Sequence, residues 1–164
     1  MPEIPLDLSK AHAADATLTP DQVAFLVETA SRAPSVHNTQ PWQFRVQRSG
    51  LDLYADQARR LRAIDPAGRE MLISCGAAVF GLRLGLRHLG YRAAVELLPD
   101  PDHPGLLARV RLDREVRPTA EDWDMLAAVP HRHTHRARSA PRRSRRGCWS
   151  GCNTTQSPRE PPWS

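Results

Sequence analysis

Apolar residues recur at helical spacing in two stretches of the chain. The first follows Thr19-Pro20-Asp21-Gln22, where a hydroxyl N-cap, a proline in the first turn and a nearby glutamine approach a capping box, and it runs to about Arg32. From Asp56 we expect the chain to turn helical, pause at Asp65-Pro66 and resume over residues 69–89, ahead of a left-handed Gly90. The segment 69–89 is apolar on almost every side, which predicts a long, buried central helix.

Alternating apolar and polar residues predict four strands. Residues 42–47 and 51–55 alternate on either side of a turn containing Gly50, a pattern typical of a β-hairpin. Two more strands are expected at 92–98 and 107–112, and Thr119 should cap a short helix to about residue 128. The order helix, hairpin, long helix, strand, strand, helix favours an α+β fold, with a mixed or antiparallel sheet packed against helices.

Composition divides the chain into three parts. The 164 residues have room for one domain, and 40% of them are apolar. Residues 1–136 carry 17 basic and 17 acidic residues, whereas residues 137–164 hold six arginines and one glutamate and so account for the net charge of +5. We expect an N-terminal arm at 1–17, a folded unit at 18–136 and a separate tail at 137–164. The folded unit is not expected to bind nucleic acid.

The tail contains no Leu, Ile, Val, Met or Phe, so it has almost nothing to bury and is expected to be disordered. Such an abrupt change suggests a translational frameshift in a G+C-rich gene. The alternative is a functional arginine-rich arm that binds nucleic acid.

The N-terminus lacks the pattern of a secretory signal, and the uncharged apolar run 71–82 is too short to span a bilayer. We therefore expect a cytoplasmic protein without a membrane partner. Cys75 lies within the apolar helical pattern, where a buried, inert thiol is expected. Cys148 and Cys152 match neither a redox pair nor a zinc site.

Polar side chains gather between the first helix and the first strand, in Ala33-Pro34-Ser35-Val36-His37-Asn38-Thr39-Gln40-Pro41-Trp42. Hydroxyl and amide groups there can both donate and accept hydrogen bonds, and two prolines stiffen the loop. This combination suits a polar, uncharged ligand edge. The alternative is a plain helix C-terminus followed by a turn between two prolines.

The same residues resemble a known family. Pro34-Ser35, Asn38 and Gln40-Pro41-Trp42 resemble the P-S-x-x-N-x-Q-P-W segment of FMN-dependent nitroreductase-like flavoproteins, and the whole string is most similar to the Acg-type branch of actinobacteria. In that family the segment lies against the flavin. The resemblance therefore implies that Pro34, Ser35, Asn38 and Gln40 line an FMN site in a nitroreductase-like fold.

A second polar stretch, His131-Arg132-His133-Thr134-His135-Arg136, places three histidines at alternating positions. The interleaved arginines would repel a divalent cation, so no metal site is expected. Arginine, hydroxyl and arginine at alternating positions suit a phosphate instead. Arg132, Thr134 and Arg136 also resemble the R-x-[ST]-x-R segment that holds the FMN phosphate in nitroreductases.

In ordinary nitroreductases the arginine segment opens the domain and two identical subunits share each flavin, whereas Acg-type proteins resemble two such units fused in one chain. Here the arginine segment follows the first unit, so the resemblance implies a first unit with the start of a second. The partner would be a second copy or a missing second unit.

The resemblance implies an NAD(P)H oxidoreductase in which FMN passes hydride to a small-molecule acceptor, a nitroaromatic or a quinone. No protein catalytic residue is expected, because no Gly-x-Ser-x-Gly elbow or marked carboxylate pair occurs. Two alternatives stay open: a protein that binds or sequesters FMN without turnover, and an inactive truncated remnant.

Overall fold

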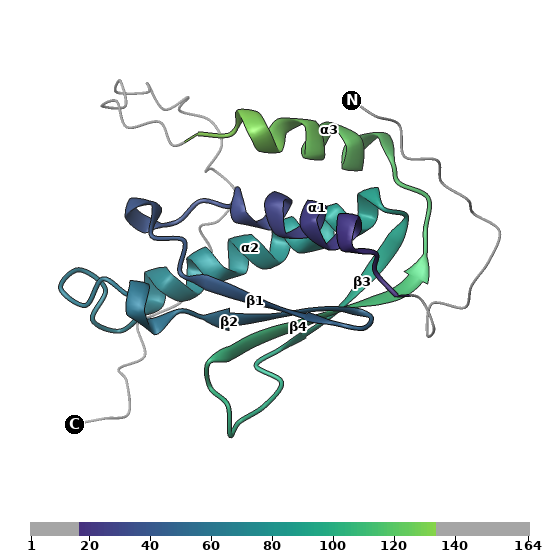
Figure 1. The fold of residues 1–164 in the computed structure, drawn as a ribbon. Helices are drawn as coiled ribbons and strands as arrows, with labels where there is room; N and C mark the ends of the chain where they lie inside the picture. The colour runs from purple at the N-terminus through teal and green to yellow at the C-terminus, as the bar shows by residue number, and fades with distance from the viewer. Residues whose placement is uncertain (1–16, 134–164) are drawn as a thin grey trace, which may run out of the picture. The chain divides into compact units, whose positions relative to one another are not determined.

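The computed structural model describes residues 17–133, and it confirms the expected α+β fold. A four-stranded antiparallel sheet has its strands in the order β1-β2-β4-β3. Helix α2 packs against the sheet, while α1 and α3 pack against α2 (Figure 1). The expected N-terminal arm at 1–17 and the tail at 137–164 lie largely or wholly outside the described residues, and those boundaries stay predictions.

The strands fall where alternation of the side chains predicts them. β1 (Trp42–Gln47) and β2 (Gly50–Ala55) form the expected hairpin, with Gln47 opposite Gly50. β3 spans Tyr91–Leu97 and β4 spans Leu106–Glu115. β4 extends three residues beyond the prediction because its last residues continue to pair with β3, as Tyr91 opposite Glu115 shows.

Local capping signals fix the helix ends. α1 spans Pro20–Ser31, and its capping box is complete because the Thr19 hydroxyl accepts from the backbone N–H of Gln22 while the Gln22 side chain accepts from that of Thr19. α2 spans Arg69–His88 and is followed by Gly90 at φ 86°, as expected. α3 spans Ala120–Ala128 and is capped by Thr119.

The expected helix from Asp56 is wrong. The chain forms only one 3-10 turn, Gln57–Arg59, before a series of turns leads to α2. The side chain of Asp56 accepts from the N–H of Ala58. That local bond favours a turn over a continuing helix. At the start of α2, the buried carboxylate of Asp65 accepts from the N–H of Met71 at 2.9 Å.

The core lies between α1, α2 and one face of the sheet. Its largest fully buried side chains come from α1, β2, α2 and β4: Leu26, Leu51, Leu53, Leu82, Leu86 and Val110. Glycines let α1 approach α2 closely. A Cβ added at Gly81 would lie 2.8 Å from the Cα of Ala30, which leaves no room for a side chain.

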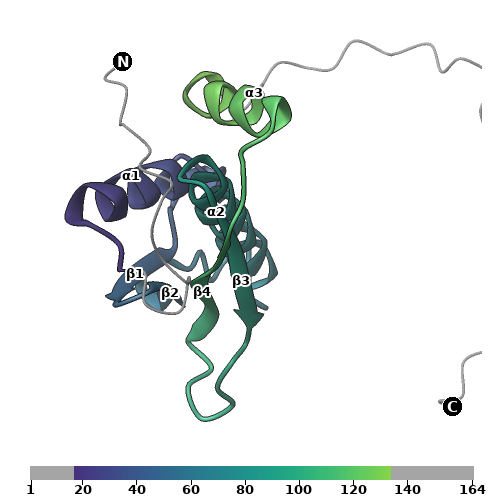
Figure 2. The same ribbon diagram turned by 90° about the vertical axis from the view of Figure 1, so that its right-hand side faces the viewer.

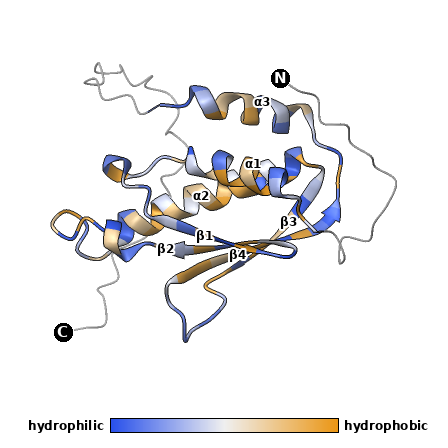
Figure 3. Cartoon of the chain, viewed as in Figure 1, coloured by the Kyte–Doolittle hydropathy of each residue, from blue (hydrophilic) through white to orange (hydrophobic). Residues whose placement is uncertain are grey.

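Helix α2 is central but not buried on every side, which corrects the sequence-based expectation. Leu72, Ile73 and Phe80 are 47%, 60% and 52% exposed, and they share one face of the helix. Figure 2 shows this helix between α1 and β3, and Figure 3 shows the hydrophobic residues along it. Within residues 17–133 no element covers that apolar face. None of the described helices is both long and apolar enough to cross a membrane.

Candidate functional site

The loop between α1 and β1 is held together by its own polar groups. The hydroxyl oxygen of Ser35 accepts from the backbone N–H of Gln40 at 2.9 Å, and the Gln40 side-chain amide donates to the carbonyl of Ser31 at 3.3 Å. A single 3-10 turn, Val36–Asn38, lies between these bonds. Ser35 and Gln40 therefore stabilise the conformation of the loop without a ligand.

Three residues of this loop have a left-handed backbone without being glycine. The φ angles are 49° at His37, 57° at Asn38 and 48° at Gln40. Asparagine tolerates this region best, whereas glutamine is rarely found there. Each such residue costs of order 1–3 kcal/mol, and clusters of strained residues occur where a ligand or partner needs a particular backbone shape.

A buried contact anchors the end of the loop to α2. The carbonyl oxygen of Pro41 accepts from the N–H of Asp56 at 3.0 Å and from the thiol of Cys75 at 3.2 Å. Burial raises the pKa of the Cys75 thiol to about 11. The expectation of a buried thiol is confirmed, while its inertness stays a prediction that the raised pKa supports. The same thiol also positions the loop.

Arg59 holds the other side of the loop, a contact that the sequence analysis did not predict. Its guanidinium donates to the carbonyl oxygen of Thr39 at 3.2 Å and lies 3.5 Å from that of Gln40. Asp56 orients the same guanidinium through an ion pair at 3.3 Å. Because Arg59 lies nearly twenty positions further along the chain, only the fold brings it to the loop.

The sequence-predicted residues of the loop border no large internal cavity of the described chain. Pro34 and Asn38 are exposed, and Ser35 and Gln40 are half-buried. The cavity beside Val36 and Thr39 measures about 10 Å³, which is roughly the space of one water molecule. Among the described residues, this loop therefore offers an open polar edge with no flavin-sized cavity beside it.

The predicted phosphate-binding set lies at the limit of the described chain. Arg132 follows the 3-10 turn Val129–His131, and it is exposed. Its backbone N–H donates to the carbonyl oxygen of Ala128 at 3.0 Å. Thr134 and Arg136 lie outside the described residues, so the grouping of the three stays a prediction.

Comparison with known proteins identifies relatives that are much longer than this chain. The chain is 40% identical over 129 residues to Rv3131 of Mycobacterium tuberculosis, and the match covers 77% of this chain and 37% of that protein. It is 38% identical over 96 residues to Acg of the same organism, over 58% of this chain and 29% of that protein. Both relatives carry the provisional name NAD(P)H nitroreductase. No protein-family model matches the chain.

A solved structure supports the same fold. A protein from Clostridium acetobutylicum, provisionally named an NADH oxidase, superposes with a TM-score of 0.50 at 14% identity, over 64% of this chain and 83% of that one. At that identity the likeness concerns the fold alone. Together with the closer sequence relatives, it shows that this chain belongs to the nitroreductase-like family, on the branch that includes Acg, and spans about a third of the length of such a relative.

Proposed function

We propose that this chain provides part of an FMN-dependent NAD(P)H oxidoreductase whose flavin lies against the loop 33–42. The observation that carries the proposal is the strained, open loop itself, with three non-glycine residues at positive φ and an exposed amide at Asn38. Strain of this kind is maintained here by Cys75 and Arg59, which fix the loop from two sides.

Bound FMN would supply the hydride chemistry, accepting reducing equivalents from NAD(P)H and delivering them to a small nitroaromatic or quinone acceptor. The chain's own residues would bind and orient the cofactor. Asn38 offers an amide that both donates and accepts. The Ser35 oxygen accepts from the backbone N–H of Gln40, and its O–H can still donate to a ligand. Arg132, Thr134 and Arg136 would hold the phosphate through charge-assisted hydrogen bonds. A cytoplasmic location would supply the nicotinamide reductant.

The flavin site would be completed by a second copy of the chain. The loop alone offers no flavin-sized cavity among the described residues, and the uncovered face of α2 shows where pairing can occur. A symmetric pair buries the same patch on both copies. Exposed apolar side chains on a central helix are typical of such a patch.

An exposed aliphatic pair near the start of α2, Leu72 and Ile73, is the centre of the proposed interface. A two-fold axis near this pair would place it against the same pair of a second copy. Phe80 lies about two turns further along α2 and would stay outside this contact.

The visible absorption spectrum of the protein with added FMN tests the cofactor. We expect tight, saturable binding that weakens about tenfold in Asn38→Gly, because this change removes one amide but preserves the positive φ. Leu98→Gly is the matched control, since Leu98 is also non-glycine at φ 48° but lies outside the loop. Absence of FMN binding, or equal loss in both variants, would reject the flavin site. Adding NADPH without oxygen should then bleach the flavin absorbance if the protein is an oxidoreductase. A protein that binds FMN without turnover would stay yellow.

Molar mass by light scattering tests the pairing. We expect a dimer that Ile73→Glu converts to a monomer, with loss of FMN binding. Val46→Glu is the control, because Val46 is 54% exposed on the edge strand β1 and Ile73 is 60% exposed on α2. A monomeric wild type that binds FMN fully would contradict the paired site while leaving the cofactor assignment intact.

A further inference from the structure

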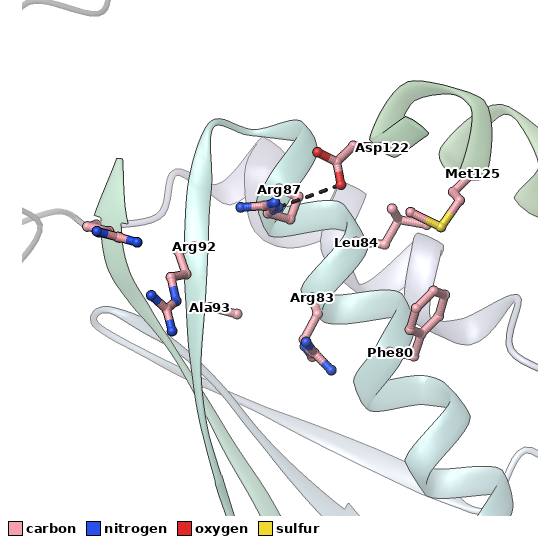
Figure 4. Close-up of a pocket in the computed structure, with 9 residues that line it drawn as sticks. Phe80, Arg83, Leu84, Arg87, Arg92, Ala93, Asp122 and Met125 are labelled. Atoms are coloured by element: carbon pink, nitrogen blue, oxygen red, sulfur yellow. Dashed lines mark ion pairs between the residues drawn. The ribbon is translucent and has the colours of Figure 1, made fainter. Parts of the chain in front are cut away.

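A concave site lies at the opposite half of α2 from the loop. It has a volume of about 490 Å³ and is bounded by α2, by β3 and β4 at one end of the sheet, and by α3 (Figure 4). Four arginines, one carboxylate and four apolar side chains line it. We call it the arginine pocket. Its volume falls within the range of small-molecule sites.

The arginine pocket concentrates positive charge that the rest of the described chain lacks. Residues 17–133 contain fifteen arginines and fourteen carboxylates, so this part of the protein is almost neutral. Four of those arginines line the pocket, against one carboxylate, that of Asp122. Clefts lined by one sign of charge raise the local concentration of oppositely charged ligands.

Two of the four guanidiniums already form ion pairs, and both of these ion pairs are long. Arg87 lies 3.6 Å from Asp122, as the dashed line in Figure 4 shows, and Arg92 lies 3.6 Å from Asp113. Hydrogen bonds from Thr119, followed by the charge of Arg87, lower the pKa of Asp122, so this carboxylate remains an anion that a ligand must accommodate. Thr119 holds Asp122 with two bonds of 2.8 Å. The carboxylate is thus committed mainly to capping α3.

The other two guanidiniums, those of Arg83 and Arg114, form no ion pair with any described residue. They come from different elements, α2 and β4, and both face the same cavity. Guanidinium groups present planar forks that suit phosphate oxygens, and an oxyanion with several oxygens can accept from more than one fork.

The remaining wall of the pocket is apolar. Phe80, Leu84, Ala93 and Met125 line it, and Phe80 is half exposed. An inorganic anion would make no contact with this apolar wall. A phosphate attached to a small aromatic or aliphatic group would instead place its charge among the arginines and its body against Phe80 and Met125.

We propose that the arginine pocket binds an organic phosphate monoester, with Arg83 and Arg114 holding the phosphate and Phe80 and Met125 contacting the organic group. The site is separate from the loop 33–42. The loop contacts α2 at Cys75, whereas the pocket arginines of α2 are eight and twelve residues further on, which is about 12–18 Å along the helix. The assignment does not depend on flavin binding.

Methionine methyl NMR tests the site directly, with phenyl phosphate as the probe. The chain has three methionines, and among the described ones Met125 lines the arginine pocket while Met71 lines the small cavity beside the loop. We expect phenyl phosphate to shift the Met125 methyl signal saturably and to leave that of Met71 in place. Inorganic phosphate should bind more weakly, because it does not contact the apolar wall.

Arginine variants test which side chains hold the phosphate. Arg83→Gln and Arg114→Gln should each weaken phenyl phosphate binding about tenfold, the usual effect of losing a charge-assisted hydrogen bond. Arg83 and Arg114 are both exposed, so both variants should fold. Arg48→Gln is the control for net charge, because Arg48 is an exposed arginine in the β1–β2 turn. It should leave binding unchanged.

Three results would overturn the proposal. One is the absence of a saturable shift at Met125. Another is an equal loss of binding in Arg48→Gln, which would indicate general charge attraction. The third is binding of a short polyglutamate peptide in preference to phenyl phosphate, which would identify the pocket as a docking surface for an acidic polypeptide.

Discussion

The thiol of Cys75 donates a hydrogen bond to the carbonyl oxygen of Pro41, with 3.2 Å between sulfur and oxygen. This bond joins the central helix to the end of the loop that carries the family resemblance. Cys75 is 1% exposed, so the contact is sealed from solvent. The position of the loop is therefore coupled to the packing of α2.

The reactivity of Cys75 should report on this contact. With Cys148 and Cys152 replaced by serine, Cys75 is the remaining thiol, and burial that raises its pKa to about 11 should make it inert to a disulfide reagent at pH 8. Modification should appear only as the protein unfolds in urea. Rapid labelling of the native protein, measured by absorbance of the released thiolate, would show that the loop opens away from α2.

Arg59 should be required for the order of the loop and much less for global stability. In Arg59→Gln we expect amide hydrogen exchange over residues 36–42 to become about tenfold faster, because the bonds to the Thr39 and Gln40 carbonyls are lost. Global stability should fall by less than about 1 kcal/mol, as is usual for an exposed ion pair. Arg62→Gln, at an exposed arginine just beyond the 3-10 turn, is the control. Equal exchange in both variants would contradict the role of Arg59.

Two glycines of α2 should respond in opposite directions to alanine. Gly81→Ala forces a methyl group against the backbone of α1, 2.8 Å from the Cα of Ala30, and should cost about 1–3 kcal/mol of unfolding free energy. Gly76→Ala meets nothing within 4 Å and should stabilise the protein by about 0.5–1 kcal/mol through helix propensity. Urea unfolding measures both. Similar losses in the two variants would mean that Gly76 is also closely packed, as in a dimer.

His88 should make stability fall in mild acid. Its ring lies 5.3 Å from that of Phe25 and 4.3 Å from that of Trp123, and its buried Nδ1 has no hydrogen-bond partner among the described residues. Burial lowers the pKa of His88 below its ordinary value of 6.5. As the pH falls, the imidazole of His88 is therefore protonated in the unfolded chain before it is protonated in the folded protein. The stability that the neutral His88 side chain contributes is complete above pH 6.5. It is lost as the pH falls from 6.5 through the lower pKa of His88 in the folded protein.

Melting temperatures at pH 7.5 and 5.5 measure this effect. The wild type should lose more stability between the two values than His88→Phe does, since phenylalanine preserves the aromatic contacts and cannot titrate. His131→Gln, at an exposed histidine, should behave as the wild type does. An unchanged pH dependence in His88→Phe would exclude His88 as the responsible group.

The local structure of this protein could be predicted because its signals lie within a few residues of one another. Thr19 and Gln22 specify the start of α1, alternation across Gly50 specifies the hairpin, and Gly90 ends α2. Each depends on hydrogen bonds or backbone preferences between near neighbours. The family resemblance of residues 34–42 is equally local.

The tertiary structure decided which distant residues meet. Arg59 reaches the loop, Cys75 reaches Pro41, and Arg83 and Arg114 face one cavity, although nothing in their separate sequence contexts links them. It also decided which apolar residues are covered. The pattern from 69 to 89 cannot distinguish a helix buried on every side from one that leaves Ile73 and Phe80 exposed, because burial depends on what packs against each face and not on the helix itself.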